Sequence, residues 1–232
     1  LAEYILVVWW AAGFARKDDI VSVRTNRGEY QSKTIIIASG KKSRELNVRG
    51  EKEFKNKGLT YCAICDGPLF KGKDVAVIGG GNSALDATLQ LLGIAKHIYL
   101  INITKELGGE SALRDKIIRN KKVTVLNNTI TTAILGEKMV SGIKVRTGGF
   151  EKILSVEGVF VEIGLIPNSE FAEQIEKNEY REIKVDCYNR TNIPGIFAAG
   201  DVTDVLEKQI IIAAGEGAKA ALGVFRYIHN HH

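Results

Sequence analysis

Two thiols separated by two residues, Cys62 and Cys65, stand beside a carboxylate, Asp66, in the run YCAICDG. Cysteines at this spacing can close a disulfide, and a nearby helix N-terminus would stabilise one thiolate and make it reactive. The adjacent carboxylate could pass a proton when the dithiol forms or breaks. The run therefore predicts a redox site whose catalytic residues are Cys62, Cys65 and Asp66.

The same spacing is half of a structural zinc site, which needs two further ligands. Cys187, His97 and the histidines at the C-terminus offer no second pair of suitable spacing, so we predict no metal site. Cys187 is interpreted as a bystander. Three cysteines with one close pair do not suit a secreted disulfide scaffold, and this favours a cytoplasmic location.

A dinucleotide fingerprint follows the cysteines. The predicted strand DVAVI at 74–78 runs into GGGNSA at 79–84, which fits G-x-G-x-x-A. Gly79 would make the turn, Gly81 would let the backbone approach a pyrophosphate, and Ala84 would let the following helix pack closely. Asn82 and Ser83 open that helix, where free N–H groups attract phosphate. The alternative is a plain glycine-rich turn.

The second strand of this unit ends where a ribose is usually bound, at INITKE, residues 101–106. This segment has no acid at Asn102 to accept from a 2′-hydroxyl and no arginine pair to hold a 2′-phosphate. Asn102 could hydrogen-bond a hydroxyl, and Lys105 could make a weak phosphate contact. The segment slightly favours NADH over NADPH.

The composition indicates an ordinary globular chain of one or two domains. It has 232 residues, of which 45% are hydrophobic and 25% charged. No apolar run is long enough to span a bilayer, so we expect no membrane association. The net charge is +5, but aromatic residues do not interleave with the basic ones, and we therefore expect no nucleic-acid partner.

Hydrophobic periodicity predicts alternating strands and helices. Before the dithiol we expect a strand at 4–12 and a hairpin of strands at 19–25 and 30–39. After it we expect strands at 73–78, 97–102 and 123–126 with helices at 82–92 and 111–120 between them. Antiparallel strands at 129–135, 139–146 and 152–156 and a buried strand at 158–163 follow. The chain should end with strands at 183–185 and 195–199 and a helix at 208–228.

With these motifs the chain resembles the low-molecular-weight thioredoxin reductase family of flavoproteins. The resemblance covers essentially the whole chain, and within the family GPLF at 67–70 and KQIIIA at 208–213 are most similar to the flavoprotein subunit of alkyl hydroperoxide reductase. The runs that carry it are YCAICDG at 61–67, VIGGGNSA at 77–84, GLIPN at 164–168, GIFAAGD at 195–201 and KQI at 208–210.

The resemblance implies an α/β fold of two Rossmann-like three-layer domains. An NAD(P)-binding domain with the CxxC, residues 46–171, would be inserted into an FAD domain made of residues 1–45 and 172–232. The family's own glycine-rich turn for the ADP half of FAD has no counterpart here, so we expect the FAD domain to lack its first part.

The resemblance also implies roles for single residues. Cys65 would face the flavin, Cys62 would attack the protein substrate and Asp66 would be the acid. Gly164 is a further predicted cofactor contact. Gly200 and Asp201 would contact the FAD ribitol and pyrophosphate, and Lys208, Gln209 and Ile210 would lie along the flavin ring.

The function implied is electron transfer from NAD(P)H through FAD and the dithiol to a thioredoxin-like or glutaredoxin-like protein, with a homodimer as the family's usual assembly. One alternative is a hydroperoxide-reductase flavoprotein, which would carry an extra N-terminal thioredoxin-like portion. Another is a non-catalytic nucleotide-binding fragment that uses the dithiol as a redox switch. Flavin absorbance bands would favour an enzyme over such a fragment.

Overall fold

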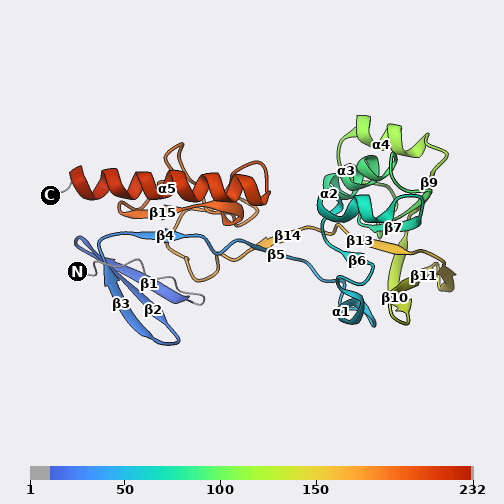
Figure 1. Cartoon of the computed structure of the whole chain (residues 1–232), viewed down its shortest axis with the longest axis horizontal. Helices are drawn as coiled ribbons and strands as arrows, with labels where there is room; N and C mark the ends of the chain where they lie inside the picture. The colour runs from blue at the N-terminus through green and yellow to red at the C-terminus, as the bar shows by residue number, and fades with distance from the viewer. Residues whose placement is uncertain (1–10, 231–232) are drawn as a thin grey trace. The chain divides into compact units, whose positions relative to one another are not determined.

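The computed structural model describes residues 11–230 of the chain, which divide into two compact units. Unit 1 combines the residues up to Lys42 with those from Leu165 onward, and unit 2 is the continuous segment Ser43–Gly164 (Figure 1). The strand predicted at 4–12 lies almost wholly outside the described residues. Within 11–230, no helix is both long and apolar enough to cross a bilayer.

Unit 2 is built on a five-stranded parallel sheet. Its strands, in spatial order, are β6 (Leu59–Thr60), β13 (Gly158–Val161), β7 (Asp74–Ile78), β8 (His97–Ile101) and β9 (Val123–Leu126). Two helices, α3 (Asn82–Leu91) and α4 (Ser111–Ile118), make the crossovers between the last three strands. The predicted Rossmann-like α/β architecture is confirmed in this unit.

The parallel sheet is the middle of three layers. On one face α3 and α4 pack over a core that includes Val77, Leu91 and Phe160. On the other face lies the antiparallel meander of β10 (Thr129–Gly136), β11 (Val140–Thr147) and β12 (Phe150–Leu154). Because both faces are covered, the central strands are continuous apolar runs rather than alternating ones.

Unit 1 carries smaller sheets and one long helix (Figure 1). The antiparallel sheet contains β1 (Ala11–Lys17), β2 (Ile20–Thr25) and β3 (Gly28–Ser32), and a parallel pair joins β4 (Ile35–Ile37) to β15 (Ile196–Ala198). Another pair joins β5 (Lys41–Ser43) to β14 (Leu165–Pro167), where the chain leaves and re-enters the unit.

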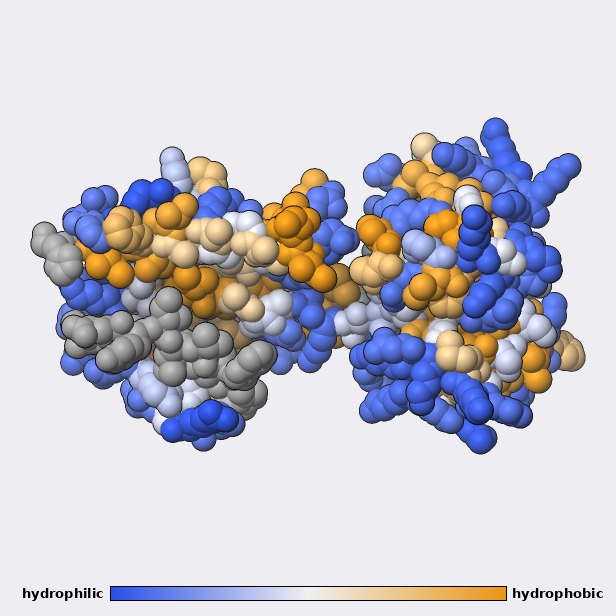
Figure 2. Space-filling model, in the orientation of Figure 1, coloured by the Kyte–Doolittle hydropathy of each residue, from blue (hydrophilic) through white to orange (hydrophobic). Residues whose placement is uncertain are grey.

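The long helix α5 (Ile210–Asn230) begins two residues later than predicted and packs on β15 through Ala220. Figure 2 shows apolar side chains gathered along this helix, and several are strongly exposed, namely Ile210, Ile211, Leu222 and Phe225. The strand predicted at 183–185 is wrong: Ile183 makes only isolated bridges to Lys177 and Thr203, because no neighbouring segment runs alongside it for longer.

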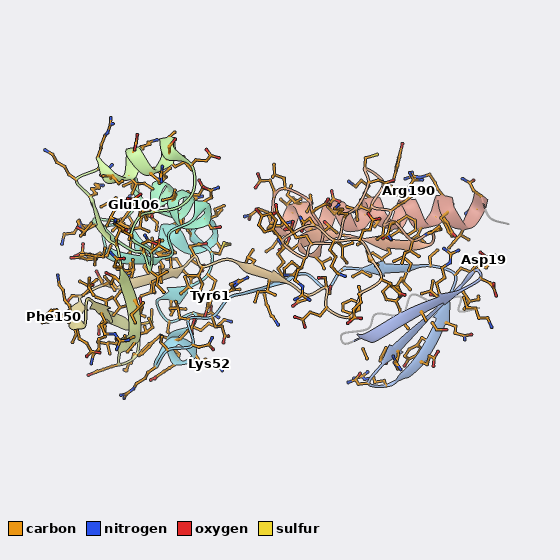
Figure 3. The ribbon with its side chains drawn as sticks, turned by 180° about the vertical axis from the view of Figure 1, so that it is seen from behind. Asp19, Lys52, Tyr61, Glu106, Phe150 and Arg190 are labelled. Atoms are coloured by element: carbon orange, nitrogen blue, oxygen red, sulfur yellow. A yellow bond between two sulfur atoms is a disulfide. The ribbon has the colours of Figure 1, made fainter. Side chains whose placement is uncertain are left out.

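A buried carboxylate, Glu51, fixes the segment that enters the dithiol. It lies on the short helix α1 (Glu51–Phe54) and is 1% exposed. Its oxygens accept from the backbone N–H groups of Leu46 and Asn47, both at 2.7 Å, and from the Tyr61 hydroxyl at 2.8 Å. Figure 3 labels Tyr61 together with Lys52 of α1. Burial and the bond to Glu51 raise the pKa of Tyr61 above its ordinary value.

Replacement of Glu51 by glutamine tests this anchor. The amide of Glu51→Gln offers a donor where the carboxylate accepts from two backbone N–H groups, so one buried donor loses its partner. We expect the free energy of unfolding to fall by about 1–3 kcal/mol, measured by urea denaturation. Glu53→Gln on the exposed side of the same helix is the matched control and should change stability by less than about 0.5 kcal/mol. Equal effects of the two substitutions would contradict this role.

Candidate functional site

The two predicted thiols are joined in the structure. Cys62 follows β6 as the N-cap of the short helix α2 (Ala63–Asp66), and its Sγ accepts from the Cys65 backbone N–H at 3.2 Å. The Cys62–Cys65 disulfide has an S–S distance of 2.09 Å and a Cα–Cα distance of 5.3 Å. Cys187 is free and exposed. One turn of helix is thus sufficient to bring the sulfur atoms together.

Asp66 is held beside the disulfide through Thr60. The Thr60 hydroxyl donates to Oδ2 of Asp66 and accepts from the Cys62 backbone N–H at 3.2 Å. The Asp66 backbone N–H donates to the carbonyl of Cys62 at 3.1 Å. A single buried threonine therefore couples the predicted acid to the backbone of the predicted nucleophile.

The outer side of this turn is open to solvent. Cys65 is exposed and Cys62 is half-buried. Ile64 is 58% exposed, and Leu69, on the 3-10 helix η1 (Gly67–Phe70), is 72% exposed. Phe70 by contrast is buried against Phe160 of the sheet. The disulfide is accessible at the surface while its supporting turn is fastened to the core.

The predicted dinucleotide turn has the packing that its sequence requires. Gly79 has φ +145°, and a Cβ there would lie 2.2 Å from the carbonyl oxygen of Glu162 and 2.9 Å from the Cβ of Ala84. Ala84 itself is fully buried. Only glycine suits this position, and the small side chain of Ala84 lets α3 approach the strand end closely.

The other residues of the turn differ in what they can offer a ligand. A Cβ at Gly81 would meet no described heavy atom within 4 Å, and Ser83 is exposed at the start of α3. The side-chain oxygen of Asn82 instead accepts from the Glu110 backbone N–H at 3.0 Å. Gly81, Ser83 and the first amides of α3 therefore form the open face of the turn, and Asn82 ties it to the loop before α4.

Asn102, predicted near a ribose, is buried at 1% exposure. Its amide nitrogen donates to the Thr104 carbonyl at 3.1 Å and to Asn127 Oδ1 at 2.8 Å, and its oxygen accepts from the Thr104 hydroxyl at 2.9 Å. In this structure Asn102 thus stabilises the loop after β8. Lys105, also in that loop, is exposed.

The order of strands brings the dithiol and the glycine-rich turn to one edge of the sheet. β13 lies between β6 and β7, with Phe160 level with Thr60 and Val161 level with Ile78. Continuing these registers places Glu162 between Cys62 and Gly79. Since the strands are parallel, all their carboxyl ends meet at this edge, where α/β sheets bind ligands.

Glu162 lies in the candidate site and was not among the predicted site residues. Burial raises the pKa of its carboxyl to about 7, with the nearby Asp86 acting in the same direction and the Ala63 backbone amide opposing it. The available signal was an acidic residue directly after the fully buried strand GVFV. Its significance depends on which strands flank β13, and this could not be read from the run itself.

The predicted flavin contacts in unit 1 cluster after β15. Gly200 and Asp201 open the 3-10 helix η2 (Gly200–Val202), with Gly200 at φ +73° and Asp201 half-buried. Gln209 accepts through its carbonyl from the Ala213 backbone N–H at 2.9 Å, and Ile210 is 88% exposed. In unit 2, Gly164 accepts from the Arg44 backbone N–H at 3.0 Å.

Lys208 is held inward by its own surroundings. Its ammonium donates to the carbonyls of Thr203, at 2.6 Å, and Val205, and lies 3.3 Å from the Glu182 carboxylate, which also pairs with Lys41. Burial and the neighbouring Lys41 lower the pKa of Lys208. In this structure Lys208 therefore stabilises the loop that leads into α5.

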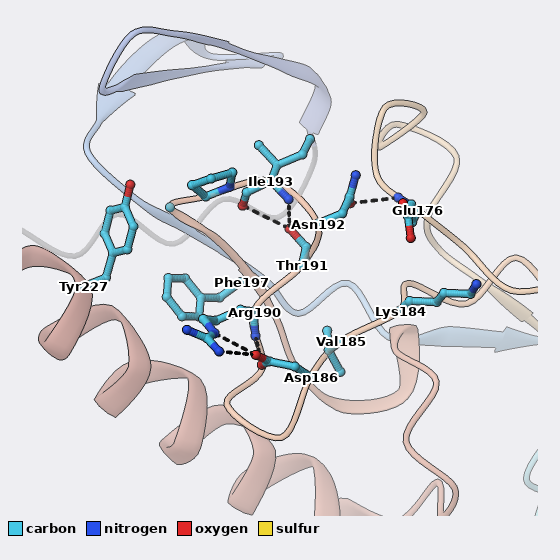
Figure 4. Close-up of a pocket in the computed structure, with 12 residues that line it drawn as sticks. Glu176, Lys184, Val185, Asp186, Arg190, Thr191, Asn192, Ile193, Phe197 and Tyr227 are labelled. Carbon is cyan, nitrogen blue, oxygen red and sulfur yellow. Dashed lines mark hydrogen bonds and ion pairs between the residues drawn. The ribbon is translucent and has the colours of Figure 1, made fainter.

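A separate pocket in unit 1 contains none of the predicted site residues (Figure 4). Several of its polar groups bond to one another: the Asp186 carboxylate accepts from Arg190 at 2.7 Å, and Asn192 accepts from the Glu176 backbone N–H at 3.0 Å. This pairing leaves the pocket without a clear set of groups aimed at a ligand, and the candidate site remains the sheet edge of unit 2.

Comparison with known proteins decides the family. The family described as pyridine nucleotide-disulphide oxidoreductase matches residues 11–217. The chain belongs to this family. Among solved structures, thioredoxin reductase from Streptococcus pyogenes MGAS5005 has a TM-score of 0.89 and 33% identity, covering 95% of this chain and 73% of that one. The resemblance to thioredoxin reductases and the Rossmann-like fold are confirmed.

Two curated relatives are more similar in sequence. The F subunit of alkyl hydroperoxide reductase from Staphylococcus aureus (strain MSSA476) is 46% identical over 94% of this chain and 44% of its own length. NADH dehydrogenase from Bacillus subtilis (strain 168) is 47% identical over 91% of this chain and 42% of its own length. The chain thus spans less than half the length of these relatives. Its membership establishes an oxidoreductase class, with FAD and a nicotinamide nucleotide as the cofactors that the family generally implies.

The raised pKa of Glu162 predicts a specific dependence of stability on pH. The folded carboxyl titrates near 7 and an unfolded one near 4.5, so between these values the unfolded chain has lost a proton that the folded chain keeps. Stability from this group therefore falls as pH rises from about 4.5 to 7 and is constant above that.

Urea denaturation of the parent chain and of Glu162→Gln at pH 4, 5, 6, 7 and 8 measures this contribution. The glutamine variant should become progressively more stable than the parent as pH rises through this window, because it carries no charge to bury. Carboxylates that do not interact with Glu162 titrate equally in both proteins and cancel in the difference. A difference independent of pH would show that Glu162 titrates normally.

Proposed function

We propose that this chain is the reductase part of a flavin-dependent disulfide reductase that passes electrons from NAD(P)H through FAD and the Cys62–Cys65 dithiol to a thioredoxin-like protein. The observation that carries the proposal is the accessible disulfide at the same sheet edge as the Gly79–Ala84 turn. Membership of the pyridine nucleotide-disulphide oxidoreductase family supports it.

The nucleotide would bind over the open face of the turn. Gly81 allows a pyrophosphate to approach the backbone, and the N-terminus of α3 offers free N–H groups near Ser83. Asn102 and Gly164 would act from the neighbouring strand ends, the first through the loop that it holds in place. The buried contact between Gly79 and Ala84 keeps this surface in position.

In unit 1, the residues after β15 are the ones that would hold FAD. Asp201 follows a buried strand end at Gly200, where a carboxylate can accept from a ribitol hydroxyl, and Gln209 and the exposed Ile210 stand at the start of α5. Bound FAD would supply two-electron transfer between the nicotinamide and the disulfide. Lys208 would need to leave Glu182 to contact the flavin.

The dithiol would act by thiol–disulfide exchange. The Cys62 thiolate, stabilised by the Cys65 backbone N–H, attacks one sulfur of the partner's disulfide and releases the other as a thiolate. Cys65 loses its proton, attacks the Cys62 sulfur of the mixed disulfide and restores the Cys62–Cys65 bond. Asp66, held by Thr60, is positioned to take and return the protons. The partner leaves with two thiols.

A second candidate is favoured by the higher identity to the F subunit of alkyl hydroperoxide reductase. In that case the dithiol would reduce a disulfide within a peroxide-reducing system rather than that of a general thioredoxin-like protein. The chemistry of Cys62, Cys65 and Asp66 would be the same in both. The two candidate partners would differ in their surfaces, and the exposed Ile64 and Leu69 would distinguish one partner from the other.

We propose NADH as the donor, a cytoplasmic location and a homodimeric parent enzyme. The loop after β8 lacks an arginine pair for a 2′-phosphate, and one close relative bears the name NADH dehydrogenase. A dithiol that must cycle suits a reducing compartment.

Gly81→Ala tests nucleotide binding. The added methyl meets no heavy atom of the described residues within 4 Å, so stability should be kept, whereas it would fill the space for the pyrophosphate. We expect the dissociation constant for NADH, measured by quenching of its fluorescence or by calorimetry, to rise at least about tenfold. NADPH should bind the parent chain about tenfold more weakly than NADH. Unchanged NADH affinity in the variant would place the nucleotide elsewhere.

Single-cysteine variants test the exchange step without flavin. Cys65→Ser, incubated with a thioredoxin activated at its own cysteine by a nitrothiobenzoate group, should accumulate a mixed disulfide through Cys62, visible by non-reducing electrophoresis and mass spectrometry. The Cys65→Ser variant and its counterpart Cys62→Ser both also carry Cys187→Ser, which removes the exposed third thiol. Cys62→Ser should form at least about fivefold less adduct. More adduct through Cys65 than through Cys62 would reverse the assigned roles, and none through either would remove the exchange proposal.

A further inference from the structure

Glu162 lies between the Cys62–Cys65 dithiol and the glycine-rich turn at 79–84. Its backbone N–H donates to the Ile78 carbonyl at 2.8 Å, which extends the β13–β7 pairing by one residue, and its carbonyl oxygen packs against Gly79. By continuation of the register with β6 it is level with Cys62. The same backbone segment thus contacts the glycine-rich turn on one side and faces the dithiol on the other.

The side chain of Glu162 points to the helical face of the sheet. Side chains alternate along a strand, and Phe160, two residues earlier, belongs to the core beneath α3 and α4. Val77 of β7 lies on the same face. This explains why the groups that act on the Glu162 carboxyl come from helices: the Ala63 amide from α2 and Asp86 from α3.

We propose that Glu162 is a positioning residue for the dithiol, and that the charge on its carboxyl sets how readily the Cys62 thiolate forms. In its ionised state the carboxylate accepts from Ala63, the first amide of the helix that Cys62 caps, and places a negative charge near the sulfur. In its neutral state that charge is absent and the helix amides act on the sulfur alone. This inference deepens the proposed function and depends on its dithiol.

The electrostatic surroundings suit such a control. Burial and Asp86 both disfavour the charged carboxyl, which brings its pKa to about 7, where modest changes alter its ionisation. The titratable groups on α2 and its N-cap are Cys62, Cys65 and Asp66, and Asp66 is engaged with Thr60. From α3 the facing group is Asp86, while the turn at 79–81 between them is all glycine.

The test measures thiolate formation directly and needs no nucleotide, flavin or partner. In the full chain carrying Cys65→Ser and Cys187→Ser, Cys62 is the single thiol, and its alkylation rate by iodoacetamide is followed from pH 5.5 to 9.5. With Glu162 present, the carboxylate formed above pH 7 should disfavour the thiolate. Glu162→Gln should therefore contain at least about threefold more thiolate at pH 8, seen as a shift of the profile to lower pH.

Two further variants separate this effect from a general disturbance. Glu157→Gln makes the same chemical change before the other end of β13, at an exposed residue, and should leave the profile unchanged. Asp86→Asn, also exposed, removes a like charge and should let Glu162 ionise at lower pH, so the suppression of thiolate begins earlier. In the Glu162→Gln background, Asp86→Asn should no longer change the profile in this way.

Superimposable profiles for the parent and Glu162→Gln, or an effect of Asp86→Asn that persists without Glu162, would overturn the inference. If the glutamine variant fails to fold, as judged by circular dichroism, the Asp86→Asn profile in the unaltered strand decides the question alone. Failure of the proposed flavoenzyme function would instead leave these profiles intact and would be seen in the nucleotide-binding and mixed-disulfide experiments.

Discussion

The parallel pairing of β13 between β6 and β7 is the constraint on which the candidate site depends. A parallel sheet directs all its carboxyl ends to one edge, and the residues that follow its strands leave the sheet at nearly the same level. Here those residues include Cys62, Glu162 and Gly79. Hydrogen bonding between backbones therefore brings the dithiol and the glycine-rich turn together, and the carboxyl group of Glu162 lies between them.

The site is rigid where it meets the core and open where it meets solvent. Glu51 holds the segment before the dithiol in place with three hydrogen bonds, and Thr60 hydrogen-bonds to Asp66 beside the dithiol. Cys65 and Ile64 remain exposed. A disulfide that exchanges with a protein partner needs this combination, since an ordered nucleophile lowers the entropic cost of reaction and an open face admits the partner.

Carboxylates in unit 2 show how surroundings separate the uses of one functional group. Glu51 is buried but receives donors on both oxygens, so its charge is satisfied and it serves as an anchor. At Glu162, burial and the nearby Asp86 together outweigh the Ala63 amide, so the pKa of its carboxyl is raised to about 7. The same contrast occurs in unit 1, where Lys41 and Asn178 hold the pKa of Glu182 down despite its burial.

Elements whose interactions are local could be predicted from the amino-acid order. The CxxC pair closes within one helical turn, the G-x-G-x-x-A run describes contacts between adjacent residues of one turn, and the apolar runs of unit 2 predicted the strands and crossover helices. The strand predicted at 183–185 is absent from the described residues, because the apolar alternation there has no partner segment of equal length. The inward direction of the Asn102 and Lys208 polar groups, and the place of Glu162 between the dithiol and the glycine-rich turn, became visible in the folded chain. Those outcomes depend on strand order and on packing between distant segments, which no single run of residues contains.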